Sequence, residues 1–151
     1  MSMTNQTLDS IVPPSQSPSA PDNEMLGRLM PFVRTLGAEF TRYSKEKVGA
    51  RLDWAPGLCT SGDMLHGGAV MSLADSTGAM CAFLNLPEGS AGTTTVESKT
   101  NFLRGVRKGF VEAVSRPLHI GRTVIVVETD VRDAEERLVA RVVQTQLVLR
   151  S

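Results

Sequence analysis

The chain has 151 residues, a length that suits one compact domain rather than two. It is 41% hydrophobic and 21% charged, as globular proteins usually are, and its low aromatic content of 5% predicts an aliphatic core. Basic and acidic residues are balanced at 16 each, which argues against proteins attracted to nucleic acid or to anionic membranes. We therefore expect neither among its partners.

The apolar segments of the chain and its cysteines bear on its cellular location and on metal binding. No charged N-terminal segment is followed by an apolar run, and no apolar stretch reaches the roughly 20 residues that span a bilayer. Cys59 and Cys81 lack the spacing with histidines that is typical of metal sites. We expect two reduced thiols, no metal and a cytoplasmic protein.

The N-terminal part divides into a tail and a short helix. Residues 1–23 are rich in Ser, Pro, Asn, Gln and Thr, which predicts a disordered tail before a single domain at 24–151. Apolar residues at helical spacing predict a short amphipathic helix from Glu24. Pro31 either kinks or ends it, and Gly37 closes this region.

The remaining pattern predicts one long helix among strands. Residues from Ala38 to Trp54 suit a strand, and a loop follows. Gly67–Leu86 is apolar and rich in small residues, with Asp75 as its only charge, which favours a buried helix. Four segments rich in Thr and Val predict further strands: Thr93–Leu103, Phe110–Leu118, Thr123–Arg132 and Leu138–Leu149.

Strands joined by short links pair antiparallel, and the helix must cover the concave face of their sheet. The sequence thus predicts an α+β fold, and we expect the sheet's edge or far face to meet a second copy.

The chemistry is concentrated at the start and middle of that helix. Gly67 and Gly68 allow close approach of a ligand to N–H groups at the positive end of the helix dipole. Such groups can bind an oxyanion, although loop flexibility also explains many Gly-Gly pairs. Asp75 is costly to bury without partners, unless it shares a solvated stripe with neighbouring serines. His66 can either take part in the site or only fix the loop.

The run Leu65–Gly68, followed by an apolar stretch and Leu73-Ala74-Asp75, resembles the signature of hotdog-fold thioesterases. The most similar group is the phenylacetate-degradation and hydroxybenzoyl-CoA thioesterase type. The resemblance spans roughly Ala38 to Leu149 and includes Thr95–Arg104 and the pair Gly121-Arg122. It implies a hotdog fold, in which an antiparallel β-sheet wraps around one long central α-helix, and an acyl-CoA thioesterase.

The same resemblance implies roles for single residues. Asp75 would be the general base or the nucleophile. The N–H of Gly67, which follows His66, would polarise the thioester carbonyl together with the N–H of Gly68. Thr95 would orient the acid or the attacking water. Relatives often carry Asn six residues before this histidine, where the present chain has Thr60, whose hydroxyl cannot reproduce a carboxamide.

The spacing indicates that the site lies between subunits. Gly67 and Asp75 are eight residues apart, or about 12 Å along a helix. Groups that act on one carbonyl must lie within about 3–3.5 Å of the reacting atoms. If both act, they come from two chains. The resemblance implies the same homodimer, which often assembles to a homotetramer.

Coenzyme A would be part of the substrate, so no separate cofactor is expected. Its phosphates require basic groups, and the candidates are Arg104, Arg107, Lys108 and Arg122, although all four are also ordinary turn residues. The acyl pocket would draw on Met64, Met71, Met80, Phe83 and Phe102, and aryl and medium-chain acyl groups both remain open.

Two alternatives keep the hotdog fold. A hotdog dehydratase would use a histidine with an acid, but the D-x-N-x-x-H spacing typical of the hydratases is absent. A non-catalytic acyl-CoA-binding protein would make Asp75 incidental. A panel of acyl-CoAs with thiol detection separates these functions from a thioesterase.

Overall fold

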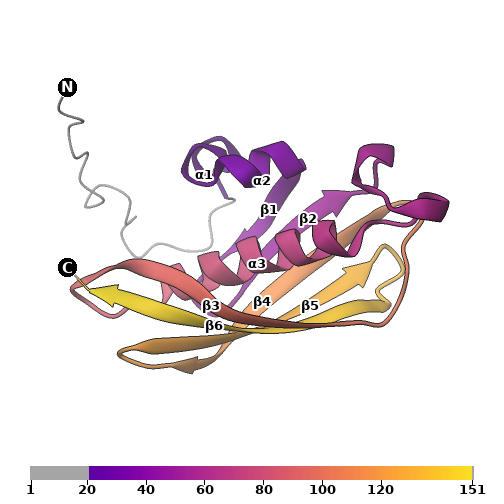
Figure 1. Ribbon diagram of the computed structural model, residues 1–151. Helices are drawn as coiled ribbons and strands as arrows, with labels where there is room; N and C mark the ends of the chain where they lie inside the picture. Colours follow the sequence, from indigo (N-terminus) through magenta and orange to yellow (C-terminus); the bar gives the residue numbers. More distant parts are fainter. Residues whose placement is uncertain (1–20, 151) are drawn as a thin grey trace.

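The computed structural model describes residues 21–150, in which α3 lies across the concave face of one antiparallel sheet (Figure 1). Most of the expected disordered tail lies outside the described residues. Its boundary moves slightly, because α1 begins at Asn23 and the side chain of Asp22 caps it by accepting a hydrogen bond from the N–H of Met25. Asn23 therefore belongs to the domain.

The N-terminal helix is two helices rather than one. α1 spans Asn23–Leu29 and α2 spans Pro31–Leu36. Proline fits the first position of a helix, where its missing N–H would have no partner, so Pro31 begins the second helix and does not kink the first. Gly37 ends α2 in the left-handed conformation, with a φ of 79°.

The prediction of a single strand from Ala38 to Trp54 is wrong. The structure has two strands there, β1 (Ala38–Tyr43) and β2 (Val48–Asp53), which pair with each other antiparallel. A tight turn joins them, closed by a 2.9 Å hydrogen bond from the N–H of Ser44 to the carbonyl of Lys47. The turn contains neither Gly nor Pro, which is why its sequence does not mark it.

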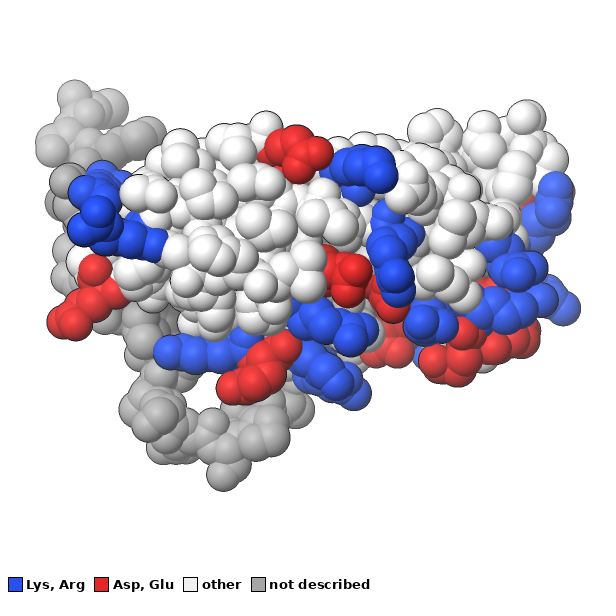
Figure 2. Space-filling model, turned by 90° about the horizontal axis from the view of Figure 1, so that it is seen from below, with Lys and Arg blue, Asp and Glu red and all other residues white. Residues whose placement is uncertain are grey.

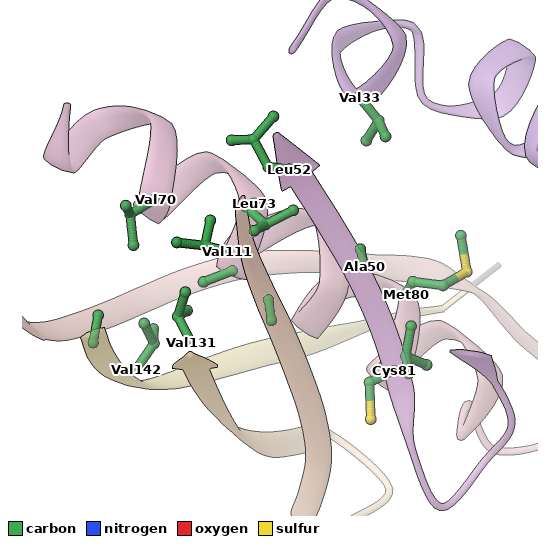
Figure 3. Close-up of a cluster of buried hydrophobic side chains, with 14 of the residues drawn as sticks. Val33, Ala50, Leu52, Val70, Leu73, Met80, Cys81, Val111, Val131 and Val142 are labelled. Carbon is green, nitrogen blue, oxygen red and sulfur yellow. The ribbon is translucent and has the colours of Figure 1, made fainter. Parts of the chain in front are cut away.

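The central helix α3 (Gly67–Leu84) confirms the predicted buried helix and ends two residues before the expected Leu86. Its small and aliphatic side chains pack on β2, β4, β5 and β6, and Figure 3 shows part of this core between the helix and the strands. The residues labelled in that cluster are Val33, Ala50, Leu52, Val70, Leu73, Met80, Cys81, Val111, Val131 and Val142. No helix within residues 21–150 is long and apolar enough to cross a membrane.

The sheet has the order β1-β2-β4-β5-β6-β3. Its last four strands in the chain are β3 (Ser90–Phe102), β4 (Phe110–Ile120), β5 (Val124–Asp133) and β6 (Leu138–Arg150).

The expectation that consecutive strands joined by short links pair with each other fails between β3 and β4. β3 pairs with β6 at the sheet's edge, and two backbone N–H groups just beyond β3 donate to the carbonyl of Val139. The segment from 103 to 109 then connects β3 to β4. Within this segment, the carbonyl of Val106 accepts a hydrogen bond from the N–H of Leu65 at 2.7 Å.

The two faces of the sheet differ in charge. Along β5, Ile125, Val127 and Val131 are buried towards α3, as the alternation predicts. Figure 2 shows the outer face, where charged side chains gather over one half and the other half is largely uncharged. Asp130 is buried on this face because it binds Arg141 and Arg132. The hydrogen bonds from Arg141 are the main cause that lowers the pKa of Asp130.

Candidate active site

Asp75 lies midway along α3, on the flank that faces β3 and β6. Its side chain is half-buried. The hydroxyl of Thr95 on β3 donates to Oδ1 of Asp75 at 3.0 Å, and Nε2 of Gln144 on β6 donates to the same oxygen at 3.3 Å. Within residues 21–150 no hydrogen bond is made to Oδ2. One carboxylate oxygen is therefore held and the other is left available.

A second glutamine extends this hydrogen-bond chain. Nε2 of Gln146 donates to the hydroxyl of Thr95 at 2.7 Å, and the hydroxyl of Thr93 donates to Oε1 of Gln146 at 3.1 Å. Gln144 and Gln146 are both 0% exposed. Sequence reasoning missed these two residues, although polar side chains in the buried alternation of the last strand were a readable signal.

The geometry of β3 directs Thr95 to this flank. Thr95 is opposite Gln146 and Phe102 is opposite Ala140, so both side chains point to the face that α3 covers. A bulge between Thr95 and Glu97 shifts the register, after which Ser98 is opposite Gln144.

The glycine turn sits at the start of α3. His66 is the N-cap residue, and its Nδ1 accepts a hydrogen bond from the N–H of Gly68 at 2.8 Å. The cap occupies the Gly68 N–H, whereas within residues 21–150 the N–H of Gly67 has no hydrogen-bond partner. A Cβ on Gly67 would lie 3.2 Å from the ring of Phe102, so that aromatic ring packs directly against the turn.

The loop before the turn is held from two sides. Nε of Arg107 donates to the carbonyl of Gly62 at 3.2 Å, and Nε1 of Trp54 donates to the carbonyl of Asp63 at 3.0 Å. Thr60 is exposed in the same loop; its N–H donates to the carbonyl of Met64 at 2.8 Å, and its hydroxyl makes no capping bond.

The structure separates the basic candidates within one chain. Arg104, Arg107 and Lys108 are exposed between β3 and β4, near the start of α3. Arg122 lies at the opposite end of β3, where it lines a hollow of about 300 Å³ with Ser90. The four residues therefore form a cluster of three and a distant single residue.

The five candidate pocket residues also separate. Met80 is buried in the core and Phe83 packs against it. The side chain of Met64 packs against Gly105, the exposed Phe102 has its ring against Gly67, and Met71 is exposed on α3. Of these five side chains, Phe102 is in direct contact with the glycine turn.

Neither cysteine has the features of a nucleophile. Cys81 is buried, which raises the pKa of its thiol to about 11, and Cys59 donates through its sulfur to the carbonyl of Ala55 at 3.3 Å. Among residues 21–150, no three His, Cys, Asp or Glu side chains are placed to hold a metal ion.

An antiparallel sheet that wraps around one long helix is a hotdog fold, and in this chain Asp75 lies midway along that helix. The model of the Thioesterase superfamily matches residues 62–140. The chain therefore belongs to that superfamily, and it is a hydrolase.

Known relatives agree with this membership. The chain is 32% identical over 126 residues to the esterase candidate Rv1847 of Mycobacterium tuberculosis, which covers 82% of this chain and 90% of that protein. It is 33% identical over 91 residues to the proofreading thioesterase EntH of Cronobacter turicensis, covering 60% and 66% of the two chains. The structure of thioesterase HI1161 from Haemophilus influenzae matches with a TM-score of 0.79 at 28% identity, over 87% of this chain and 93% of that one.

Proposed function

We propose that the protein is an acyl-CoA thioesterase in which Asp75 is the general base or the nucleophile. The observation that carries the proposal is the carboxylate of Asp75, which is held through Oδ1 by Thr95 while Oδ2 stays unpaired among the described residues. A carboxylate fixed in this way can take a proton from water or attack a carbonyl carbon directly.

In the water route, Oδ2 of Asp75 takes a proton from water as the water oxygen bonds to the thioester carbon. The carbonyl electrons move to oxygen, and the resulting oxyanion is stabilised by the free N–H of Gly67. When the carbonyl re-forms, the C–S bond breaks and the CoA thiolate leaves with the proton from Asp75. The products are the free acid and CoA.

We propose that the two groups of one site come from two subunits. The helix arithmetic supports this, because about 12 Å separates Gly67 from Asp75 along α3. β3 supports it as well: this edge strand is 13 residues long and is paired only with β6 among the described strands. Its exposed apolar side chains include Val96 at 57% and Phe102 at 52%. Antiparallel pairing of two β3 edges would bury them and form a homodimer.

A homotetramer would use another surface. Leu118, Leu147 and Leu149 are exposed, and β6 ends on the side of the molecule where the outer face is largely uncharged (Figure 2). A second dimer packed there would bury them.

The basic residues fit the phosphates of CoA in this arrangement. In an antiparallel dimer, the C-terminal end of β3, near the start of α3, would lie beside the N-terminal end of β3 in the partner chain. Arg122 of one chain can then approach the partner's loop that carries Arg104, Arg107 and Lys108. These four residues are the proposed CoA-binding group, and no further cofactor is needed for hydrolysis.

The first test is thiol release from a panel of aryl and aliphatic acyl-CoAs. Asp75→Asn keeps the shape of the side chain and removes the base, so kcat is expected to fall by about 10²–10⁴-fold. Glu39→Gln, exposed on β1 at the opposite edge of the sheet from β3, is the matched control and leaves kcat unchanged. Turnover that persists in Asp75→Asn would contradict the mechanism, and a panel without thiol release would favour the acyl-CoA-binding protein or the dehydratase.

The second test removes the Gly67 N–H. Gly67 is the first residue of α3 and follows an extended His66, with φ −65° and ψ 135°, so proline is compatible with the backbone at this position. Gly67→Pro is expected to lower kcat by about 10²–10³-fold because the oxyanion loses a donor. Gly67→Ala adds a similar contact with Phe102 but keeps the N–H, so it separates crowding from loss of the donor.

The third test addresses the shared site. Asp75→Asn and Gly67→Pro chains, each inactive alone, are mixed and allowed to exchange subunits. One intact site forms in each mixed dimer, so about a quarter of the wild-type activity should return. No recovery, when mixed dimers are demonstrated by mass spectrometry, would place both groups in one chain.

A further inference from the structure

Two glutamines interrupt an otherwise aliphatic row on β6. Val142 and Val148 are buried beneath α3, and Gln144 and Gln146 occupy the two positions between them with no exposure to solvent. A buried amide lowers stability unless its hydrogen bonds are replaced, so packing alone would favour apolar side chains at both positions. Their partners give the reason for their presence.

Burial of Gln144 also requires a glycine in the facing helix. A Cβ on Gly78 would lie 2.3 Å from Oε1 of Gln144, so only glycine leaves room for this amide beside α3. Glycine in a helix interior is itself unfavourable. Oε1 of Gln144 is also buried without a hydrogen-bond partner among the described residues, while Nε2 reaches Oδ1 and the carbonyl of Asp75 at 3.3 and 3.4 Å. Two unfavourable choices thus serve one contact with Asp75.

Gln146 reaches Asp75 through Thr95. A threonine hydroxyl has one proton, and because Gln146 donates to this hydroxyl, the proton of Thr95 is directed to Oδ1 of Asp75. Oε1 of Gln146 lies 3.1 Å from the hydroxyl of Thr93, and the carbonyl of Leu147 is an equally near acceptor for the same proton. The hydrogen bonds from Gln146 to Thr95, and from Thr95 and Gln144 to Asp75, thus all lead to the carboxylate.

We propose that Gln144 and Gln146 are positioning residues for Asp75, which hold Oδ1 so that Oδ2 faces the thioester or the attacking water. This inference rests on the proposed function, because positioning has a kinetic consequence only if Asp75 acts on the substrate. Neither glutamine touches the substrate itself, since both are buried beneath α3.

The variants Gln144→Met and Gln146→Met keep the length of the side chain and remove the amide. Each is expected to lower kcat by about tenfold while KM changes by less than about twofold, because ground-state binding is untouched. Thr145→Val is the matched control: Thr145 lies between them on β6, points to the other face, and its replacement leaves kcat unchanged.

A double-mutant cycle separates positioning from a purely structural role. If the glutamines act through Asp75, adding Gln144→Met to Asp75→Asn causes no further loss of the residual rate. A further loss of the same size, or a rise in KM at constant kcat, would overturn the inference. Circular dichroism checks that each variant folds. If Gln144→Met does not fold, Gln144→Ala combined with Gly78→Ala refills the space and serves the same measurement.

Failure of the inference and failure of the proposed function give different results. If Asp75→Asn is inactive while Gln144→Met and Gln146→Met turn over at the wild-type rate, the positioning role is wrong and the thioesterase mechanism stands. If Asp75→Asn retains wild-type kcat, the proposed mechanism is wrong, and the positioning role is overturned with it.

Discussion

The two flanks of α3 differ in what they bury. Towards β4 and β5, Leu73 packs among Val111 and Val131, and none of these three side chains is exposed (Figure 3). Towards β3 and β6, the helix presents Asp75 to Thr95 and Gln144. Burial of apolar surface explains the first flank. It does not explain the second, where polar groups replace aliphatic ones at a cost, and this second flank holds the groups of the proposed site.

The largest effect on stability is expected on the apolar flank. Leu52 on β2 is 1% exposed, and Leu52→Ala leaves a cavity that should lower the free energy of unfolding by about 2–5 kcal/mol. The kcat of the folded enzyme should not change, because no polar contact of Asp75 is touched. Urea unfolding and thiol release below the unfolding transition measure the two quantities. A large loss of kcat here would break the division between the flanks.

The next largest effect is that of Gly78→Ala on stability, and its sign should depend on whether Gln144 is present. Gly78→Ala places a methyl group against the Gln144 amide and should lower the free energy of unfolding by about 1–3 kcal/mol, with a loss of kcat. In a Gln144→Ala chain the same methyl has room, and alanine should raise the free energy of unfolding by up to about 1 kcal/mol over glycine. Thermal unfolding of the four proteins measures both signs, and equal signs would contradict the packing described for Gly78.

The sequence predicts the apolar flank better than the polar one. Periodicity and small residues are local signals, and they identify α3 and the buried side of β5. The division of this region into β1 and β2 is not predicted, because the turn at Ser44–Lys47 contains only polar residues and neither Gly nor Pro. The pairing of β3 with β6 is not predicted either, because it joins residues far apart in the chain and no local sequence pattern indicates it.

The same limit applies to the site. Asp75, Thr95 and Gly67 follow from a motif resemblance, and the structure places Thr95 against Asp75. Gln144 and Gln146 match no motif, and their role depends on the non-local contact of β6 with α3 and β3. For the glycine turn, the resemblance names Gly67 as the expected donor, and the coordinates add that the histidine cap occupies the N–H of Gly68.

A smaller effect is expected at the edge of the polar flank. Thr95→Val removes the hydroxyl that donates to Asp75 and should lower kcat by about tenfold, equivalent to about 1.4 kcal/mol in the activation free energy. Thr95→Ser keeps the donor and should retain most of the activity. Steady-state thiol release compares the two variants. Equal rates for Val and Ser would remove the hydroxyl from the mechanism and leave Gln144 as the carboxylate's partner.

The smallest effect belongs to the outer face, which has charge but no part in the proposed site. The pKa of Asp130 is lowered by the hydrogen bonds from Arg141, so this carboxylate stabilises the fold above its unfolded pKa of about 3.9. The contribution is lost as the pH falls through the lower folded value. Asp130→Asn should cost no more than about 1 kcal/mol at pH 7, because Arg141 is half-exposed, and should leave kcat unchanged. Urea midpoints between pH 7 and pH 2 should therefore fall less steeply in Asp130→Asn than in the wild type. Equal slopes would show that Arg141 stabilises the carboxylate no better than water does, whereas a loss of kcat at pH 7 would connect the outer face to the site.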